Sequence, residues 1–295
     1  MKQQIEAEAL LTHPDKIIFP KSGIRKIEYL LYLRAVAPFM FPFLANRALT
    51  VIRYPHGIGG LHFFQKNCPD YAPSFVRTVV EEDIRAIICD RLDTLLWLGN
   101  QLAIEFHIPF RVVGQRCPIE IVIDLDPPDR AHFSLAVEAA LLLQGVLERL
   151  QIASFPKLSG SRGLQIHIPL SRQQLTFEDT RRFTTFLAEW LIEQHPDRFT
   201  TERLKKNRGS RLYVDYIQHA EGKTIICPYS LRAKPDATVA TPLAWNEVTE
   251  ALRIESFTMA TVQQRLAQGM NPWKNYFQTE NRALPPIIAS LRLVK

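Results

Sequence analysis

Three aspartates in this sequence have the residue type and spacing that metal-dependent chemistry requires. The stretch IEIVIDLDPPDR, residues 119–130, has the pattern of an apolar strand that ends in Asp124 and Asp126. Side chains at positions i and i+2 of a strand lie on one face, so these two carboxylates point the same way. A third, Asp215, lies in the apolar segment YVDY, where an unpaired charge would be costly. Carboxylate oxygens suit Mg²⁺ or Mn²⁺, and three of them can hold two ions that activate a hydroxyl and stabilise a leaving pyrophosphate.

The residues alone leave other interpretations of these carboxylates open. An Asp-x-Asp pair at the end of a strand also serves as a turn or capping device. In glycosyltransferases the same pair holds a metal ion and a sugar nucleotide. Asp215 can instead form an ion pair with a neighbouring arginine.

A loop of small residues follows the aspartate strand in sequence. The segment SGSRGLQIHIPL, residues 159–170, combines serines and glycines with Arg162, and small residues let backbone amides approach an anion. Gln165 and His167 share one face of the strand that follows. Beside the aspartate strand this loop is a candidate triphosphate site, although taken alone it is more typical of a tight connection between strands.

Basic and aromatic side chains elsewhere could contact nucleic acid. The segments PDRFTTERLKKNRGSR (196–211) and YSLRAKP (229–235) are rich in arginine and lysine, and GGLHFFQKN (59–67) places Phe63 and Phe64 beside Lys66. Exposed aromatic rings can stack on bases, which contributes about 1–3 kcal/mol per base. Charge runs are more often solvated faces, and the residues alone favour one phenylalanine in the core.

The composition indicates a globular protein that could bind an anionic partner. The chain has 295 residues, 46% of them hydrophobic, and a net charge of +6. Its four scattered cysteines form no C-x-x-C pair, which argues against a zinc ribbon or a disulfide framework. We find no signal peptide and no uninterrupted apolar stretch of about 18 residues, so we expect a cytoplasmic protein without a membrane span.

Strand and helix patterns alternate along the chain without a linker or an internal repeat. We therefore predict one α/β (α+β) domain over residues 1–295, with an N-terminal subregion to about 115 and a catalytic core over about 116–295. The expected elements are a buried helix after PKSGIRK that ends near Pro38, a hairpin over 48–66, a helix and a strand over 93–107, a strand over 119–125, a helix over 130–150 capped by Asp129, strands on both sides of the 159–163 loop, a helix over 176–194 with a Thr176–Asp179 capping box, a strand over 211–219, a helix over 241–252 and an irregular C-terminal tail.

These pieces, in this order, resemble the polymerase domain of bacterial ATP-dependent ligase D, a member of the archaeo-eukaryotic primase superfamily that acts in non-homologous end joining. The matching stretches cover nearly the whole chain and include no ligase or phosphoesterase module, so we expect an excised domain or a stand-alone polymerase. The stretches are DKIIFP (15–20), RKIEYLLYL (25–33), RYPHGIGGLHFFQKN (53–67), TLLWLGNQLAIEFH (94–107), IVIDLDPP (121–128), KLSGSRGLQIHIPL (157–170), RLYVDYIQHAEGKTIICPYSLRAKP (211–235) and TPLAW (241–245).

The resemblance implies a primase-like catalytic core with a mixed sheet like that of an RNA-recognition motif, joined to an N-terminal α/β unit with flanking helices. It implies a template-directed nucleotidyltransferase, a DNA-dependent DNA/RNA polymerase that prefers ribonucleotides, fills short gaps and extends ends. The implied cofactors are two Mn²⁺ or Mg²⁺ ions, and the substrates are NTP or dNTP. The implied partners are DNA with gaps or broken ends whose 5′-phosphate is recognised, Ku, and a ligase module in cis or in trans.

The resemblance also assigns roles to individual residues. It assigns metal binding and catalysis to Asp124, Asp126 and Asp215. It assigns nucleotide binding to His107, Ser159, Ser161, Arg162, Gln165, Ser230, Arg232 and Phe64. It assigns DNA binding to Lys16, Lys26, Arg53, Phe63 and Lys66, with the first two lysines at the 5′-phosphate.

Two departures from the family pattern affect nucleotide contacts more than the metal ligands. Gln165 stands where many relatives have histidine, and His219 stands where relatives often have asparagine after the third aspartate. Two other functions remain to be weighed. A catalytically weak module that only bridges DNA ends would not need all three aspartates, and a glycosyltransferase would have no use for the Phe63–Lys66 segment or the paired lysines.

Overall fold

The structure is a computed structural model, and it describes residues 11–170 and 174–291. Contacts between Cα atoms divide the chain into two compact units. Unit 1 comprises Met1–Val113, Ile225–Thr241 and Glu255–Met270, and unit 2 comprises Gly114–Thr224, Pro242–Ile254 and Asn271–Lys295. The first change of unit falls close to the predicted subdivision near residue 115, but two later segments assigned to the catalytic core belong to unit 1.

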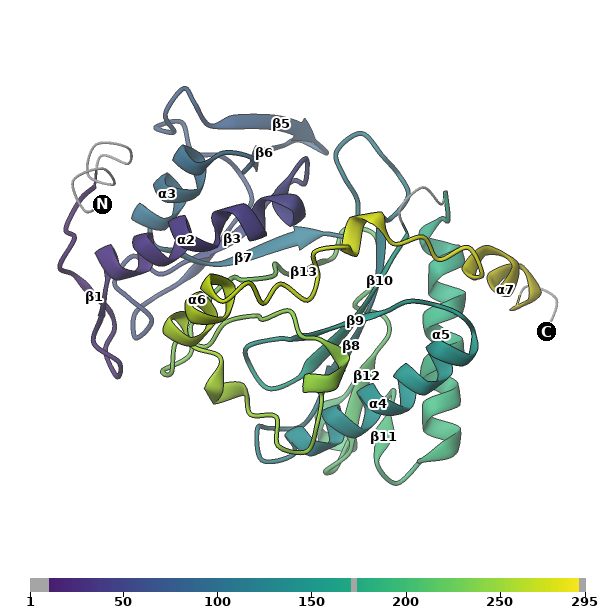
Figure 1. Ribbon diagram of the computed structural model, residues 1–295. Coiled ribbons are helices and arrows are strands. Elements are labelled where there is room, and N and C mark those ends of the chain that lie inside the picture. Colours follow the sequence, from purple (N-terminus) through teal and green to yellow (C-terminus); the bar gives the residue numbers. More distant parts are fainter. Residues whose placement is uncertain (1–10, 171–173, 292–295) are drawn as a thin grey trace. The chain divides into compact units, whose positions relative to one another are not determined.

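Unit 1 is built on a four-stranded sheet in the order β13-β7-β3-β4 (Figure 1). Its strands are β3 (Thr50–Arg53), β4 (Phe63–Gln65), β7 (Ala103–Pro109) and β13 (Thr224–Ile226). Two hairpins add β1 (Ile17–Phe19) with β2 (Ile24–Arg25), and β5 (Arg77–Glu81) with β6 (Ile84–Ile88). The helices are α2 (Lys26–Leu44), α3 (Leu92–Asn100) and α6 (Met259–Ala267). The predicted hairpin over 48–66 is confirmed by the antiparallel pairing of β3 with β4.

Helix α2 continues past the proline at which the sequence predicted its end. It runs to Leu44 and contains both Pro38 and Pro42. An internal proline removes one backbone hydrogen bond, but these two lie four residues apart, on the same exposed face of the helix. The carbonyl groups that lose a partner therefore lie on the solvent side, where water can replace the lost bonds.

Among the described residues, α2 alone is long and apolar enough to cross a membrane by length and composition, a test that core helices also pass. Its inner face is fully buried at Tyr29, Leu30 and Leu33. The Tyr29 and Tyr32 hydroxyls donate to the carbonyl oxygens of Ala103 and Tyr229. These contacts make α2 the core helix of unit 1.

Unit 2 contains a five-stranded sheet in the order β11-β12-β8-β10-β9 (Figure 1). Its strands are β8 (Glu120–Asp126), β9 (Phe155–Leu158), β10 (Leu164–Pro169), β11 (Phe199–Thr200) and β12 (Leu212–Asp215), and its helices are α4 (Phe133–Arg149), α5 (Phe177–Gln194) and α7 (Leu284–Leu291). The pair β11–β12 is parallel and the others are antiparallel. The predicted mixed α/β fold is confirmed.

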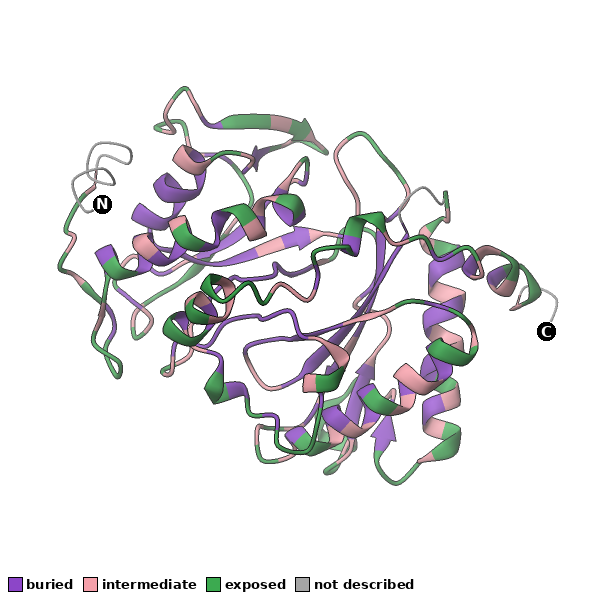
Figure 2. Cartoon of the chain, viewed as in Figure 1, coloured by how far each residue is buried: buried purple, intermediate pink, exposed green. Residues whose placement is uncertain are grey.

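Alternation along the central strand β8 separates packing from chemistry. Ile121, Ile123 and Leu125 are fully buried, as Figure 2 shows for most of the strand. The alternate positions include Asp124 and Asp126, which are partly exposed. Helices α4 and α5 both contact β8. The strand therefore contributes an apolar face to the core and carboxylates to the opposite face.

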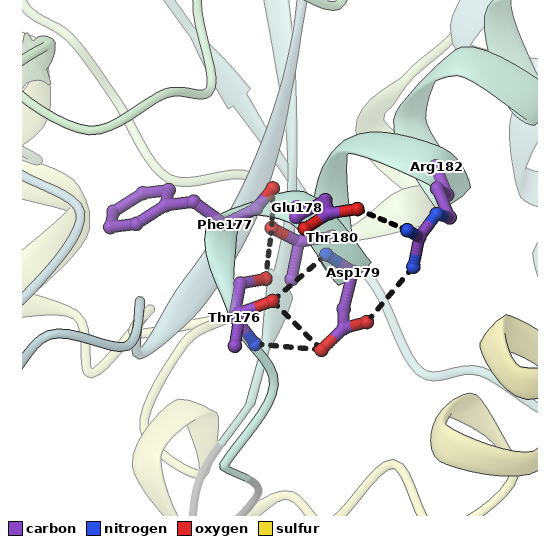
Figure 3. A network of polar contacts seen from close by, with 6 residues as sticks. All are labelled: Thr176, Phe177, Glu178, Asp179, Thr180 and Arg182. Carbon is purple, nitrogen blue, oxygen red and sulfur yellow. Dashed lines mark hydrogen bonds and ion pairs between the residues drawn. The ribbon is translucent and has the colours of Figure 1, made fainter.

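Helix α5 begins with the capping box that the sequence predicted. The Asp179 amide donates to Thr176 Oγ1 at 3.1 Å, and the Thr176 amide donates to Asp179 Oδ2 at 3.1 Å (Figure 3). Arg182 pairs with Glu178 and Asp179 on the same turn. These bonds satisfy backbone donors that the first turn of a helix would otherwise leave open.

Helix α4 begins at Phe133, three residues later than the sequence predicted. Its N-cap is His132, and Asp129 Oδ1 instead accepts from the His132 amide at 3.1 Å and from Nδ1 at 2.9 Å. Asp129 therefore stabilises the turn that leads into the helix.

The predicted helix over 241–252 is wrong, and so is the irregular C-terminal tail. Only a short 3₁₀ turn, Trp245–Glu247, forms in the first segment. The backbone there extends beside β9. Pro242 forms a β-bridge with Lys157, and the Leu243 amide donates to the Pro156 carbonyl. Further on, α6 and α7 form, and α7 carries its two prolines in the first turn, where no intrahelical amide is needed.

Candidate active site

The three predicted metal-binding aspartates meet on one face of the unit 2 sheet. Asp124 of β8 lies directly opposite Asp215 of β12, and Asp126 lies opposite Tyr213. Directly opposite residues of an antiparallel pair share a face, with Cβ atoms about 4.5–5.5 Å apart. Asp215 is the last residue of β12 rather than a mid-strand residue. Two neighbouring strands thus end in three carboxylates on the same side.

Two arginines hold Asp126. Arg162 donates to both carboxylate oxygens, through Nε at 2.6 Å and Nη2 at 2.7 Å. Arg208 Nη1 lies 3.7 Å from Oδ2, and its guanidinium stacks over the Tyr213 ring at 3.8 Å from the centroid. A forked pair of this kind is stronger and more directional than a single ionic contact.

The other two carboxylates accept uncharged donors. Gln165 Nε2 donates to Asp124 Oδ1 at 3.1 Å, across the β8–β10 pair. Asp215 Oδ1 accepts from the Tyr213 hydroxyl at 3.2 Å and from the Gln218 amide at 3.0 Å. With these partners, no group of three or more His, Cys, Asp or Glu side chains in residues 11–170 and 174–291 is already arranged to hold a metal ion.

The carboxylates repel one another. Burial first, and then the charge of Asp126, raise the pKa of Asp124 to about 7, against the hydrogen bond from Gln165. Burial and the charge of Asp126 also raise the pKa of Asp215. A divalent cation would relieve this repulsion, and the all-oxygen donor set is the kind that Mg²⁺ and Mn²⁺ prefer. The residues present therefore fit such an ion.

The 159–163 loop closes on itself through Ser159. Its Oγ accepts from the amides of Ser161 at 3.2 Å and Gly163 at 3.1 Å. Arg130 Nε donates to the Ser161 carbonyl at 2.7 Å. Two amides expected to face an anion are thus already bonded to Ser159, and the loop instead presents Arg162 to the aspartates.

Gly163 is needed because the backbone of β8 passes close by. A Cβ added there would lie 2.1 Å from the Leu125 carbonyl oxygen, which sits between the two β8 aspartates in sequence. We expect Gly163→Ala to push β8 away, to cost about 2–3 kcal/mol of folding stability, and to reduce any activity that depends on Asp124 and Asp126. Urea unfolding and an activity assay would measure both effects.

Gly145→Ala, within α4, is the matched control for Gly163→Ala. An added Cβ there would meet only Arg149 Nη1, at 3.7 Å. Because alanine favours a helix interior over glycine by about 1 kcal/mol, this variant is expected to be at least as stable as the wild type. A Gly163→Ala protein with unchanged stability would contradict the assignment of this close contact.

Unit 1 gathers a second set of predicted residues around a carboxylate that sequence reasoning missed. Glu105 accepts from His107 Nε2 at 3.2 Å and pairs with Arg232 Nε at 3.2 Å. Ser230 is fully buried, and its hydroxyl bonds the Phe106 amide and the Leu231 carbonyl. The available signal for Glu105 was its position two residues before His107, which places both side chains on one face of β7.

The two predicted 5′-phosphate lysines also lie in unit 1, near each other. Lys26 is 3% exposed, and its Nζ donates to the Thr12 carbonyl at 2.6 Å and to Asn100 Oδ1 at 3.1 Å. Burial, and then the charge of Lys16, lower the pKa of Lys26 to about 8. Lys16 Nζ donates to the Pro55 carbonyl at 2.6 Å. Their role at a phosphate stays a prediction.

The aromatic pair of β4 is more exposed than the residues alone suggested. Phe63 is 45% and Phe64 66% exposed, so the expectation that one of them lies in the core is wrong. Arg53 stacks over the Phe63 ring at 5.3 Å, and Lys66 nearby is exposed. Neighbouring strand residues face opposite faces of a sheet. Both faces are therefore accessible at β4, which is the edge strand of this sheet.

The predicted site residues are divided between the two units. Unit 2 holds Asp124, Asp126, Ser159, Ser161, Arg162, Gln165 and Asp215. Unit 1 holds Lys16, Lys26, Arg53, Phe63, Phe64, Lys66, His107, Ser230 and Arg232.

Comparison with known proteins agrees with this mixed α/β fold. The model of the family described as LigD, primase-polymerase domain, matches residues 25–273. The chain therefore belongs to the LigD primase-polymerase domain family.

Two relatives that are themselves named LigD support this family membership. The bifunctional non-homologous end joining protein LigD of Bacillus subtilis (strain 168) is 49% identical over 284 residues, which are 96% of this chain and 46% of that protein. The multifunctional LigD of Mycolicibacterium smegmatis is 30% identical over 247 residues, 81% of this chain and 32% of that protein. The chain thus spans less than half the length of these relatives.

A solved structure matches the fold. The polymerase domain from Mycobacterium tuberculosis Ligase D in complex with DNA superposes with a TM-score of 0.84 at 28% sequence identity. The match covers 92% of this chain and 98% of that one.

Proposed function

We propose that this chain is a template-directed nucleotidyltransferase that extends DNA ends and fills short gaps in bacterial non-homologous end joining. The observation that carries the proposal is the register that places Asp124 opposite Asp215, with Asp126 on the same face. Three carboxylates that repel one another and lie on two neighbouring strands are costly for stability, and a catalytic metal site explains why they are there.

In this proposal the residues of the carboxylate face bind and orient the reactants. Asp124, Asp126 and Asp215 would hold two Mn²⁺ or Mg²⁺ ions, which would lower the pKa of a bound hydroxyl and stabilise charge at phosphorus. Arg162 and Gln165 keep Asp126 and Asp124 in place through the bonds described above. Charge that develops on the reacting phosphate beside the carboxylate face would be balanced by an arginine donor, for which Arg162 is the candidate.

The substrates and partners follow from family membership and are part of the proposal. The Mycobacterium tuberculosis polymerase domain is bound to DNA, and we propose gapped or broken DNA with a 5′-phosphate as the substrate here. The exposed Phe63 and Phe64 provide rings that can stack on bases. We further propose a preference for ribonucleotides, cooperation with Ku and a ligase module, and action in the bacterial cytoplasm.

Primer extension on a duplex with a short gap tests this function. The assay would contain Mn²⁺, compare ribonucleotides with deoxynucleotides, compare a 5′-phosphate with a 5′-hydroxyl across the gap, and include Asp126→Ala. We expect the wild type alone to add nucleotides, ribonucleotides to be favoured, and the 5′-phosphate to increase addition. No addition, combined with tight binding that depends on the 5′-phosphate, would instead support a module that bridges DNA ends.

A further inference from the structure

Glu105 is a buried carboxylate inside a cluster to which the family resemblance assigns nucleotide binding. It lies on β7, an inner strand that pairs with β3 on one side and β13 on the other. Glu105 is opposite Ile52 and His107 is opposite Thr50, so both project from the same face. The Glu105 side chain is 6% exposed, whereas those of His107 and Arg232 are 16% and 19% exposed. The anion is thus covered by two more accessible nitrogen-bearing side chains.

Two hydrogen bonds and one ion pair keep Glu105 ionised. His107 Nε2 donates at 3.2 Å and the Ala233 amide at 3.0 Å, and Arg232 Nε forms the ion pair at 3.2 Å. Burial alone would raise its pKa, but the His107 hydrogen bond, the Arg232 charge and the Ala233 amide outweigh burial and lower the pKa to about 2. A buried carboxylate with this set of partners is a fixed negative charge throughout the neutral pH range.

A fixed carboxylate determines what its two side-chain partners can do. It accepts only, so His107 Nε2 must carry a proton, and the ring orientation is set. The Arg232 guanidinium is held at Nε, which restricts its rotation. Pre-set donors bind an anion better than flexible ones, because less side-chain freedom is lost on binding.

Ser230 holds the segment that carries Arg232 in register with the same strand. Its hydroxyl accepts from the Phe106 amide at 3.0 Å and donates to the Leu231 carbonyl at 3.1 Å, and the residue is fully buried. The 230–233 segment is therefore tied to β7 at two places, at Phe106 through Ser230 and at Glu105 through Arg232 and Ala233.

We propose that Glu105 is a positioning residue that orients Arg232 as a donor for the triphosphate of the incoming nucleotide and fixes the His107 ring in the same cluster. This inference rests on the proposed function and deepens it. The ligand is an anion with several phosphate groups, because the proposed function uses a nucleoside triphosphate and the planar guanidinium of Arg232 matches the geometry of phosphate oxygens. The carboxylate itself lies below the donors and is kept from the ligand by them.

Glu105→Gln is the most informative variant, because it keeps the side-chain volume and an accepting oxygen but removes the charge. Glu81→Gln is its matched control, since Glu81 is also a strand residue of unit 1 that forms an ion pair, with Arg111 at 2.9 Å. For each protein we would measure kcat and KM for the nucleotide on gapped DNA. We would also measure the Kd of a ribonucleoside triphosphate, and of the corresponding monophosphate, without DNA.

We expect Glu105→Gln to raise KM and the triphosphate Kd at least tenfold, with a much smaller change in the monophosphate Kd and in kcat. The preference for triphosphate over monophosphate should therefore fall about as much as the triphosphate affinity does. Glu81→Gln should match the wild type in the nucleotide KM and in the ratio of the triphosphate Kd to the monophosphate Kd. A purely structural role for Glu105 would weaken both nucleotides alike.

A folded Glu105→Gln protein with an unchanged triphosphate preference would overturn the proposal. If Glu105→Gln does not fold, Glu105→Asp takes its place, because it keeps the charge but withdraws the carboxylate by one methylene. An unchanged triphosphate preference in Glu105→Asp would also overturn the proposal. A wild type that neither binds nor adds nucleoside triphosphates would overturn the proposed function, and this inference with it. A wild type that does both, with variants that match it, would overturn the role of Glu105 alone.

Discussion

Asp124→Asn is expected to abolish nucleotide addition and, in the absence of metal ions, to raise the melting temperature. The substitution keeps the shape of the side chain and the oxygen that accepts from Gln165. It removes one of the three proposed carboxylate ligands and with it several kcal/mol of charge stabilisation, which corresponds to a loss of about a thousandfold or more in rate. Primer extension and thermal unfolding of the same samples, with and without Mn²⁺, would measure both effects.

The stability gain follows from the raised pKa of Asp124. An aspartate in an unfolded chain titrates near its ordinary value of about 4, whereas burial and the charge of Asp126 raise the pKa of Asp124 to about 7 in the folded protein. Between these values the folded state binds more protons than the unfolded state, so the stability contributed by this group falls as pH rises from about 4 to 7. The Asp124→Asn variant lacks this loss of folding stability, so its gain in stability over the wild type should reach its full size above pH 7.

Asp129→Asn is the control for charge removal on the same stretch of chain. Asp129 is exposed, and its Oδ1 accepts from the His132 amide at 3.1 Å and from His132 Nδ1 at 2.9 Å. It should retain wild-type activity and show no gain in melting temperature. Mn²⁺ should raise the melting temperature of the wild type and of Asp129→Asn but not that of Asp124→Asn. Full activity in Asp124→Asn would contradict the assigned role.

Glu120→Ala is expected to cause a large loss of stability in unit 2. Glu120 is 1% exposed, and its Oε2 accepts from the Tyr276 hydroxyl at 2.7 Å and from His167 Nδ1 at 2.9 Å. These bonds attach the C-terminal segment to the end of β8 that lies away from the aspartates. Removing one member of a buried charged network leaves the others without their partner and costs about 3–5 kcal/mol.

Two further variants separate the network from a general effect of losing a glutamate. Tyr276→Phe removes one hydrogen bond of Glu120 and should cost about 1–2 kcal/mol. Glu138→Ala removes a glutamate that pairs with Arg198 at the surface, and such pairs contribute about 0–1 kcal/mol. Urea unfolding of the three variants gives the comparison. If Glu120→Ala loses less free energy of unfolding than Tyr276→Phe, the Glu120 network does not hold the C-terminal segment in place.

The sequence predicted those elements whose signals are local. Correct predictions include the strand that carries Asp124, the strands on both sides of the 159–163 loop, and the Thr176 capping box. The signal for each of these elements comes from residues that lie two or three positions apart. The end of α2 was mispredicted because the cost of Pro38 depends on which face of the helix it occupies. The 241–252 helix was mispredicted because Leu243 bonds β9, about 90 residues earlier in the chain.

Partners within the site were harder to predict than its principal residues. The three aspartates could be identified from period-two spacing and from the resemblance. The bidentate bond from Arg162 to Asp126 depends on how β8 and β10 pair, and period-two spacing does not fix that pairing. Glu105 was missed because a carboxylate is not the residue type expected beside a bound phosphate. Its function becomes apparent only when His107 and Arg232 are seen to share it.

The central claim is that the carboxylate face supports templated nucleotide addition. The most direct measurement is single-nucleotide addition opposite each of the four template bases, with each of the four ribonucleotides and Mn²⁺, for the wild type, Asp124→Asn and Asp129→Asn. We predict that the wild type and Asp129→Asn add only the complementary nucleotide and that Asp124→Asn adds none. Addition that ignores the template base, or that survives in Asp124→Asn, would contradict the claim.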